Sequence, residues 1–111
     1  MILDQRTNNR VSFFVGGDLY RDAQGEKLGR VVIRDISYSG LCIETLEPLE
    51  AGQTAYLDFE IAGRFSFRRV PVMVARTTPG AGSYVTGLNF HHGEDRRKIR
   101  HALAFTIESS S

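Results

Sequence analysis

The sequence predicts a mainly all-β fold: a six-stranded antiparallel β-barrel followed by one C-terminal α-helix. Six short segments rich in strand-forming residues follow one another, polar turns separate them, and helical periodicity appears only near the C-terminus. No segment between two strands reads as a helix long enough for a parallel crossover, so we expect antiparallel pairing. Closing such a sheet into a barrel would remove its exposed edges.

The first three predicted strands are short. Residues 11–15 are rich in strand formers, and the glycine-containing segment 16–18 is expected to end that strand. After a polar stretch, residues 27–34 read as the second strand. The polar segment 35–40 then makes a tight turn, and residues 41–44 read as the third strand.

The clearest strand covers residues 55–61, in which apolar and polar side chains alternate with a period of two. Asp58 and Glu60 are expected to face away from the core. The core face carries Ala55, Leu57, Phe59 and Ile61. The dipeptide at positions 62–63, Ala-Gly, reads as a hairpin connection.

Two further strands follow the hairpin. Residues 65–76 read as a strand, and residues 84–90 read as the last one. One face of the first of these carries Val70, Val72 and Val74. Pro71 cannot donate a hydrogen bond to a neighbouring strand, so it indicates an edge position or a bulge. A long turn is expected over residues 77–83.

Residues 93–108 are predicted to form the C-terminal helix. Glu94 and Asp95 lie where the helix begins, which is favourable to its dipole. The apolar residues at helical spacing are Ile99, Ala102, Leu103, Phe105 or Thr106, and Ile107. We therefore expect a single domain over residues 1–111, with a flexible N-terminal loop in residues 1–10 and the barrel in residues 11–90.

Composition and charge narrow the classes of function. A chain of 111 residues with 41% apolar residues suits one compact core, and it has no apolar run long enough to insert into a membrane. The N-terminal segment lacks the pattern of a secretory signal, so we expect the cytoplasm. A net charge of +1 argues against DNA or RNA as the partner. Twelve of the fourteen basic residues are arginine, whose planar fork matches phosphates and guanine edges.

The sequence contains no motif for catalysis or for a metal or cofactor. A phosphate loop, a nucleophile elbow and a His-Glu zinc pattern are all absent, so we expect a protein that is not an enzyme. Cys42 lies between two apolar residues and is interpreted as a small core residue. His91, His92 and His101 are interpreted as surface or junction histidines, because adjacent histidines on a strand point to opposite faces.

Two polar features suggest ligand binding when they are taken together. Arg6 and Arg10 are separated by poor helix formers that lead directly into a strand, so they are expected on a loop that can fold over a ligand. In the turn after the second strand, Asp35 offers a carboxylate that can accept from a nucleobase N–H. In the same turn, the hydroxyl of Ser37 suits a phosphate oxygen, and Gly40 permits a close approach to the backbone.

The pattern Arg-x-x-x-Arg followed by Asp-x-Ser-x-x-Gly resembles the signature of PilZ domains. The matching residues are Arg6, Arg10, Asp35, Ser37 and Gly40. Gly52-Gln53 and the segment 87–90, Gly-Leu-Asn-Phe, also fall where the family has a Gly-Gln turn and a Gly-x-x-Phe strand. The resemblance covers nearly the whole chain, from about residue 5 to residue 107.

The resemblance implies a six-stranded antiparallel barrel with a C-terminal helix, and cyclic di-GMP as the ligand. It implies that Arg6 and Arg10 wrap the ligand from the N-terminal loop, while Asp35 and Ser37 contact it from the barrel beside Gly40. Ordering of the loop on binding would create a new surface for a downstream protein partner.

Two other functions stay open at this point. One is a protein adaptor that has the same fold and ignores the nucleotide. The other is a barrel that binds single-stranded nucleic acid, because Phe65 and Phe67 alternate near Arg64, Arg68 and Arg69. The basic residues of the hairpin, and those of the helix at positions 96–100, are otherwise expected on solvated faces, with docking of a protein or an anion as the alternative.

Overall fold

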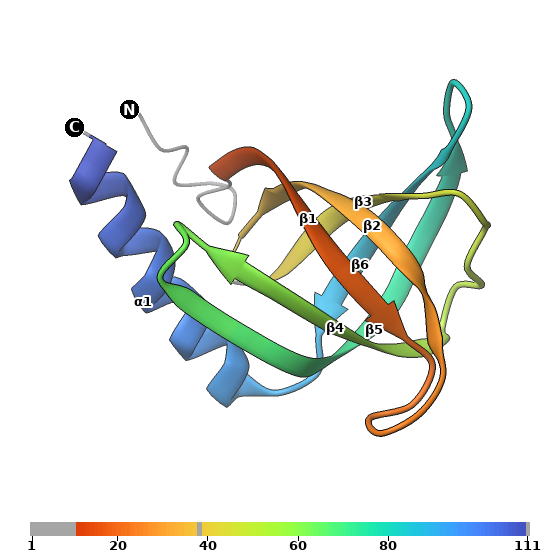
Figure 1. Ribbon diagram of the computed structural model, residues 1–111, viewed down its shortest axis with the longest axis horizontal. Helices are drawn as coiled ribbons and strands as arrows, with labels where there is room; N and C mark the ends of the chain where they lie inside the picture. The colour runs from red at the N-terminus through yellow and green to blue at the C-terminus, as the bar shows by residue number, and fades with distance from the viewer. Residues whose placement is uncertain (1–10, 38, 111) are drawn as a thin grey trace.

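Six antiparallel strands close into a barrel, and one helix follows them (Figure 1). The computed structural model describes the backbone of residues 11–37 and 39–110 and the side chains of residues 15–37 and 39–105. The strands lie in the order β1-β2-β3-β6-β5-β4. Their bounds are Val11–Tyr20 (β1), Lys27–Ile36 (β2), Gly40–Thr45 (β3), Thr54–Ile61 (β4), Phe65–Pro79 (β5) and Tyr84–Phe90 (β6), and helix α1 covers Gly93–Ser110. The predicted fold class is confirmed.

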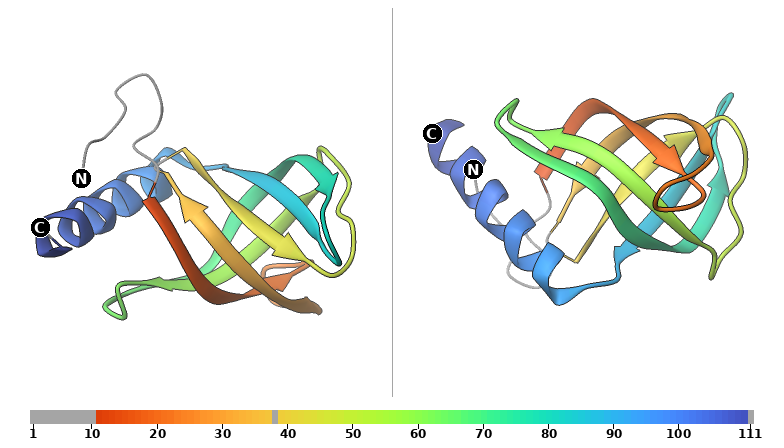
Figure 2. Two further views of the ribbon diagram at one scale, coloured as in Figure 1. Left: turned by 90° about the horizontal axis from the view of Figure 1, so that it is seen from above. Right: turned by 60° about the horizontal axis from the view of Figure 1, so that its bottom comes forward.

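The core lies inside the barrel and under the helix. The predicted inward residues of β4 are all buried, as are the three valines of β5: Ala55, Leu57, Phe59, Ile61, Val70, Val72 and Val74. Helix α1 packs along one end of the barrel (Figure 2) and buries Ile99, Ala102 and Leu103. Burial of each large aliphatic side chain contributes roughly 1.5–3 kcal/mol, so the alternating pattern and the helical pattern together account for the fold. The side chains of Thr106 and Ile107 lie outside the described part of the chain.

Strand β1 does not end at the segment 16–18, and that prediction is wrong. The strand continues to Tyr20, and its last residues pair with β4. A Cβ atom at Gly17 would lie 3.0 Å from the carbonyl oxygen of Asp58. The glycine therefore permits the close approach of two backbones that closes the barrel, which is one of the meanings of glycine inside a strand.

Strand β5 is longer than the sequence predicted. It continues past Arg76 to Pro79, so the turn expected over residues 77–83 is confined to residues 80–83. The Thr77 hydroxyl donates to the carbonyl oxygen of Leu49 at 2.8 Å and lies 3.3 Å from the hydroxyl of Thr86. These hydrogen bonds hold the polar end of β5 in the barrel wall, where propensity alone favours a turn.

Pro71 lies at a local edge of β5, as the prediction of an edge position requires, because the pairing of β5 with β6 begins only at Val72. Strand β5 pairs with β4 on one side and with β6 on the other. The carbonyl oxygen of Pro71 accepts a hydrogen bond from the backbone N–H of His91, one residue beyond the end of β6. The missing N–H of the proline thus falls where the pairing with β6 ends, so no hydrogen bond of the ladder is lost.

Closure of the barrel places two aspartates opposite each other. Strands β1 and β4 pair over three residues, and Asp18 faces Asp58 in this register. Like charges directly opposite one another destabilise a pair of strands. Cations compensate both carboxylates: Lys27 lies 3.0 Å from Asp18, and Arg69 lies 2.5 Å from Asp58.

Arg69 joins three parts of the barrel through its contacts. Its backbone N–H donates to Asp58 at 2.6 Å, and its side chain donates to the carbonyl oxygen of Ala23 at 3.1 Å. Its guanidinium lies 3.3 Å from the centre of the Tyr20 ring. Asp58 faces away from the core as predicted, but these contacts leave it only 6% exposed. Arg69 is half-buried, with 34% of its side chain exposed, whereas Arg68 lies on the solvated face as expected, with 74% exposed.

The pKa of Asp58 is lowered below its ordinary value of 3.8. Burial alone would raise it, but the hydrogen bonds from the backbone N–H and the guanidinium of Arg69 lower it, and so do the charges of Arg69 and Arg68. A carboxyl whose pKa is lower in the folded state stabilises that state above its unfolded pKa. That stabilisation is lost as the pH falls through the folded pKa.

The substitution Asp58→Asn should lower the free energy of unfolding at neutral pH by about 1.5–3 kcal/mol, because it removes charge-assisted hydrogen bonds from a buried site. The difference from the wild type should shrink as the pH falls below 3.8. Urea unfolding at several pH values measures both effects. Glu60→Gln, an exposed change on the same strand, is the control and should have little effect. A loss that does not vary with pH would contradict the role assigned to the charge.

Candidate ligand-binding site

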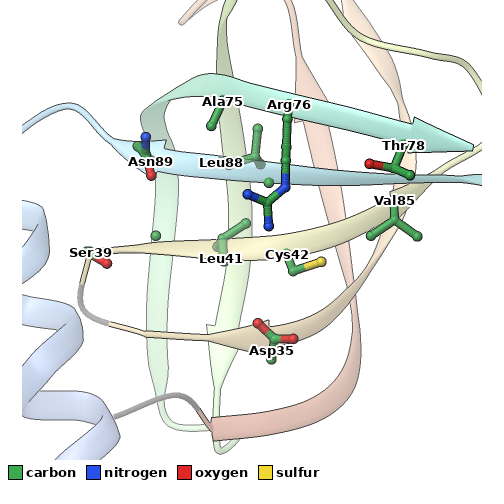
Figure 3. A pocket seen from close by; sticks show the side chains of 12 residues that line it. Asp35, Ser39, Leu41, Cys42, Ala75, Arg76, Thr78, Val85, Leu88 and Asn89 are labelled. Carbon is green, nitrogen blue, oxygen red and sulfur yellow. The ribbon is translucent and has the colours of Figure 1, made fainter. Parts of the chain in front are cut away.

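A cavity of about 600 Å³ opens on the outer face of the barrel, where β2, β3, β6 and β5 lie side by side (Figure 3). Its volume is in the range of small-molecule sites. The residues that line it are Asp35, Ser39, Gly40, Leu41, Cys42, Ala75, Arg76, Thr78, Val85, Gly87, Leu88 and Asn89.

A row of four residues, one from each strand, crosses this cavity. Cys42 pairs with Asp35 on one side and with Gly87 on the other, and Gly87 in turn pairs with Arg76. Side chains of directly paired residues point to the same face of a sheet. With strands about 4.8 Å apart, the two ends of the row are separated by roughly 14 Å. We call these four residues the Asp35–Arg76 row: a carboxylate at one end, a guanidinium at the other, and small residues between them.

A β-bulge places Asp35 on the outer face. Ile33 is buried in the core, and strict alternation would turn the side chain two residues later into the core as well. The pairing with β3 shifts between Ile33 and Asp35, which leaves Arg34 as the extra residue. Asp35 therefore faces the cavity, and Ile36 returns to the core with no exposed surface.

A second bulge does the same for Arg76. Val74 is buried, and the pairing with β6 shifts between Val74 and Arg76, which leaves Ala75 as the extra residue. Figure 3 shows the Arg76 side chain extending from β5 across β6 towards β3. None of the described residues forms an ion pair or a hydrogen bond with its guanidinium, so this charge is available to a ligand in the cavity.

The sequence pattern does not mark Arg76 as a site residue. The alternation of valines in β5 assigns position 76 to the inward face, and only the bulge overturns that assignment. Cys42 was also misplaced, because it was expected in the core. Its neighbours Leu41 and Ile43 are buried, whereas Cys42 is half-buried and lines the cavity. The period-two alternation within β3 was the signal that could have placed it.

Gly40 and Gly87 both border the cavity but for different reasons. A Cβ atom at Gly40 would overlap the carbonyl oxygen of Leu88, so packing of β3 against β6 requires glycine there. A Cβ atom at Gly87 would lie 3.7 Å from the Cγ of Arg76, which is ordinary van der Waals contact. Glycine at position 87 therefore leaves open space beneath the arginine, and the fold does not require it.

Ser37 lies inside the turn between β2 and β3. Its side chain is fully buried, and its hydroxyl donates to the carbonyl oxygen of Gly40 at 3.2 Å and lies 3.2 Å from the hydroxyl of Ser39. Ser39, and not Ser37, lines the cavity. The structure thus brings Asp35 and Gly40 together at the cavity and directs Ser37 into the turn. Tyr38 lies outside the described residues.

Arg6, Arg10 and the predicted loop in residues 1–10 lie outside the described residues. The chain is described from the start of β1, where Val11 pairs with Ile36 and Ser12 pairs with Asp35. The Asp35–Arg76 row therefore continues onto β1 at Ser12, two residues after Arg10 in the sequence.

The aromatic residues that suggested nucleic-acid binding are engaged elsewhere. Phe67 is 8% exposed and stacks on Phe59 with ring centres 4.9 Å apart. Phe65 packs edge-on against Phe105 at 5.3 Å. Phe67 therefore has no open face on which a nucleic-acid base could stack, and Phe65 is half-buried against the helix.

The histidines lie away from the cavity. The rings of His91 and His92 are 6.2 Å apart, and His101 packs against Phe65. Within residues 11–37 and 39–110, no group of three or more His, Cys, Asp or Glu residues is placed to hold a metal ion. In the same part of the chain, no helix has the length and hydropathy needed to cross a membrane.

A closed barrel of six antiparallel strands followed by a C-terminal helix defines the fold class of this chain. The family model of the PilZ domain matches residues 4–107 of the sequence. The chain belongs to the PilZ domain family. No curated protein sequence matches it.

Solved structures share the fold at low sequence identity. MrkH of K. pneumonia in complex with c-di-GMP has a TM-score of 0.73 at 18% identity, covering 98% of this chain and 54% of MrkH. The inhibitor of motility MotI/DgrA of Bacillus subtilis has a TM-score of 0.67 at 11% identity, covering 89% and 50%. The PilZ domain of CeSA from a cellulose-synthesizing bacterium has a TM-score of 0.61 at 15% identity, covering 87% and 97%. The chain thus spans about half the length of MrkH and MotI.

The two glycines of the cavity should respond differently to alanine. Gly40→Ala should destabilise the domain by about 1–3 kcal/mol, because the added methyl group forces β3 away from β6. Gly87→Ala should change stability by about 0.5 kcal/mol or less, because its methyl group meets only the side chain of Arg76 at contact distance. Urea unfolding of the two variants tests this contrast, and equal losses would contradict the packing described.

Proposed function

We propose that this domain is a receptor for cyclic di-GMP and that the ligand lies over the Asp35–Arg76 row. The observation that carries the proposal is the row itself. A guanidinium that has no partner among the described residues and a carboxylate lie at opposite ends of a floor of small residues, in a chain of the PilZ family. MrkH, which shares the fold, forms a complex with this nucleotide.

The chemistry of the ligand suits the two ends of the row. Cyclic di-GMP carries two guanines and two phosphates. Arg76 can form a bidentate pair with O6 and N7 of a guanine or with a phosphate. Asp35 can accept hydrogen bonds from the N–H groups on the other edge of a guanine. The small side chains at positions 42 and 87 allow flat bases and the sugar-phosphate ring to approach the sheet.

The N-terminal arginines complete the proposed site. Arg10 directly precedes Val11, the first residue of β1. The start of β1 pairs with the end of β2, at the Asp35 end of the row. Arg6 and Arg10 would close over the nucleotide from that side with charge-assisted hydrogen bonds to its phosphates. Ordering of the loop on binding would present a new surface to a downstream protein.

Ser37 and Gly40 support the proposed site through the turn. The hydroxyl of Ser37 is held by the carbonyl oxygen of Gly40, so we propose that it fixes the turn that places Asp35 and Ser39 at the cavity. Gly40 keeps β3 close to β6, which holds Cys42 and Gly87 in one row. On this account the domain binds and signals, and it needs no catalytic group, metal or cofactor.

Isothermal titration with cyclic di-GMP tests the proposal. The wild type should bind with micromolar or tighter affinity, and GMP should give no heat. Arg10→Ala, Asp35→Ala and Arg76→Ala should each weaken binding by about tenfold or more, since each removes a charge-assisted hydrogen bond worth about 1.5–3 kcal/mol. Gly87→Val should also weaken binding, because it fills the space beneath Arg76 without changing any charge.

Arg96→Ala is the matched control, because it removes an exposed arginine that does not line the cavity. It should bind cyclic di-GMP like the wild type. If the folded wild type gives no heat at high protein concentration, the receptor proposal fails. A nucleotide-independent adaptor, the reading that the fold shared with the motility inhibitor MotI allows, would then take its place.

A further inference from the structure

A second hollow of about 580 Å³ lies between the start of β5 and helix α1. Phe65 and Phe67 form its apolar part, and Arg64, Arg97, Lys98 and His101 surround them. We call this hollow the helix groove. It shares no lining residue with the cavity that holds the Asp35–Arg76 row.

The aromatic contacts fix the shape of the helix groove. Phe65 packs edge-on against His101, with ring centres 5.9 Å apart, and against Phe105 at 5.3 Å. Arg64 places its guanidinium 4.5 Å from the centre of the Phe105 ring. These contacts join the β4–β5 hairpin to the helix, so both walls of the groove are held in place before any partner arrives.

The rim of the helix groove is cationic. Arg64, Arg97 and Lys98 line it, and no carboxylate does so among the described residues. No ion pair with a described residue neutralises Arg97. Lys98 pairs with Glu94 at 3.4 Å, but both side chains are more than 60% exposed, so solvent screens this pair. The groove therefore combines an apolar floor with an excess of positive charge.

We propose that the helix groove docks an acidic segment of a partner protein, with one aromatic or aliphatic side chain of that segment packed on the floor that Phe65 and Phe67 form. The positive charge of the rim favours Asp and Glu in the segment, and the apolar floor favours the aromatic or aliphatic side chain. A second copy of this chain fits poorly there, because it would bring one cationic rim against another. An anionic membrane surface would meet the protruding arginines but would leave the recessed floor unfilled.

The positions of the two sites allow them to be occupied together. The groove uses the start of β5, at Phe65 and Phe67, and the cavity uses its end, at Arg76. Eight residues of β5 lie between Phe67 and Arg76, and the nine steps along the strand correspond to at most about 30 Å. A partner in the groove would therefore leave the cavity open to a nucleotide.

Selection from a phage-displayed library of random dodecapeptides tests this proposal. The wild-type domain should enrich peptides in which Asp or Glu flanks an aromatic or aliphatic residue. A selected peptide should bind the double variant Arg64→Glu/Arg97→Glu about tenfold or more weakly, because two attractive contacts become repulsive. It should bind the control Arg21→Glu/Arg96→Glu like the wild type, because this control makes the same change in net charge at exposed sites outside the groove.

Amide chemical shifts locate the bound peptide, and the largest changes should fall in residues 64–67 and 97–101. Failure to enrich acidic peptides, or equal binding by the groove variant and the wild type, would overturn the proposal. A third outcome would assign this face to a membrane instead. In that outcome no acidic peptides are enriched, but the wild type binds phosphatidylglycerol vesicles and the groove variant does not. Titration of the groove variant with cyclic di-GMP keeps the two proposals separate, because its affinity for the nucleotide should be unchanged.

Discussion

Two β-bulges are the constraint on which the proposed site depends. Without them, period-two alternation would bury Asp35 after Ile33 and Arg76 after Val74. Each bulge adds one residue to its strand and turns a charged side chain to the outer face. The following residue turns inward again: Ile36 is buried in the core, and Thr77 is half-buried. The same two irregularities therefore preserve the packing of the interior and build the ends of the row that crosses the cavity.

The barrel can support such irregularities because its closure is fixed elsewhere. Strands β1 and β4 meet over only three residue pairs, at the end of β1 far from the row. Arg69, held in a left-handed backbone conformation at another bulge, joins Asp58, Tyr20 and the loop at Ala23. Two ion pairs, Lys27 with Asp18 and Arg69 with Asp58, compensate the repulsion between the facing aspartates. The further contacts of Arg69 tie the first hairpin to β4 and β5. The cavity that holds the Asp35–Arg76 row and the helix groove then occupy separate parts of the barrel wall.

Much of the fold could be predicted from the sequence, because alternation of apolar and polar residues indicates which side chains are buried and turn residues indicate where strands end. The inward faces of β4 and β5 and the amphipathic helix follow from this logic. The extent of β1 and β5 could not be predicted, because Gly17 and Thr77 act through contacts with residues distant in sequence. At the site, the motif identified Asp35 and Gly40, but Arg76 and Cys42 required the register of four strands. Ser37 was selected for its hydroxyl, yet the turn uses that hydroxyl itself.

The most direct test locates the binding site of cyclic di-GMP. Amide chemical shifts of the labelled domain, followed during titration with the nucleotide, measure that position. The account predicts that the largest changes on titration fall along the row, at Asp35, Cys42, Gly87 and Arg76, and that residues 64–67 change little. Saturable binding that leaves Gly87 and Arg76 unperturbed would contradict it, because the nucleotide would then be held without the arginine that the bulge in β5 turns outward.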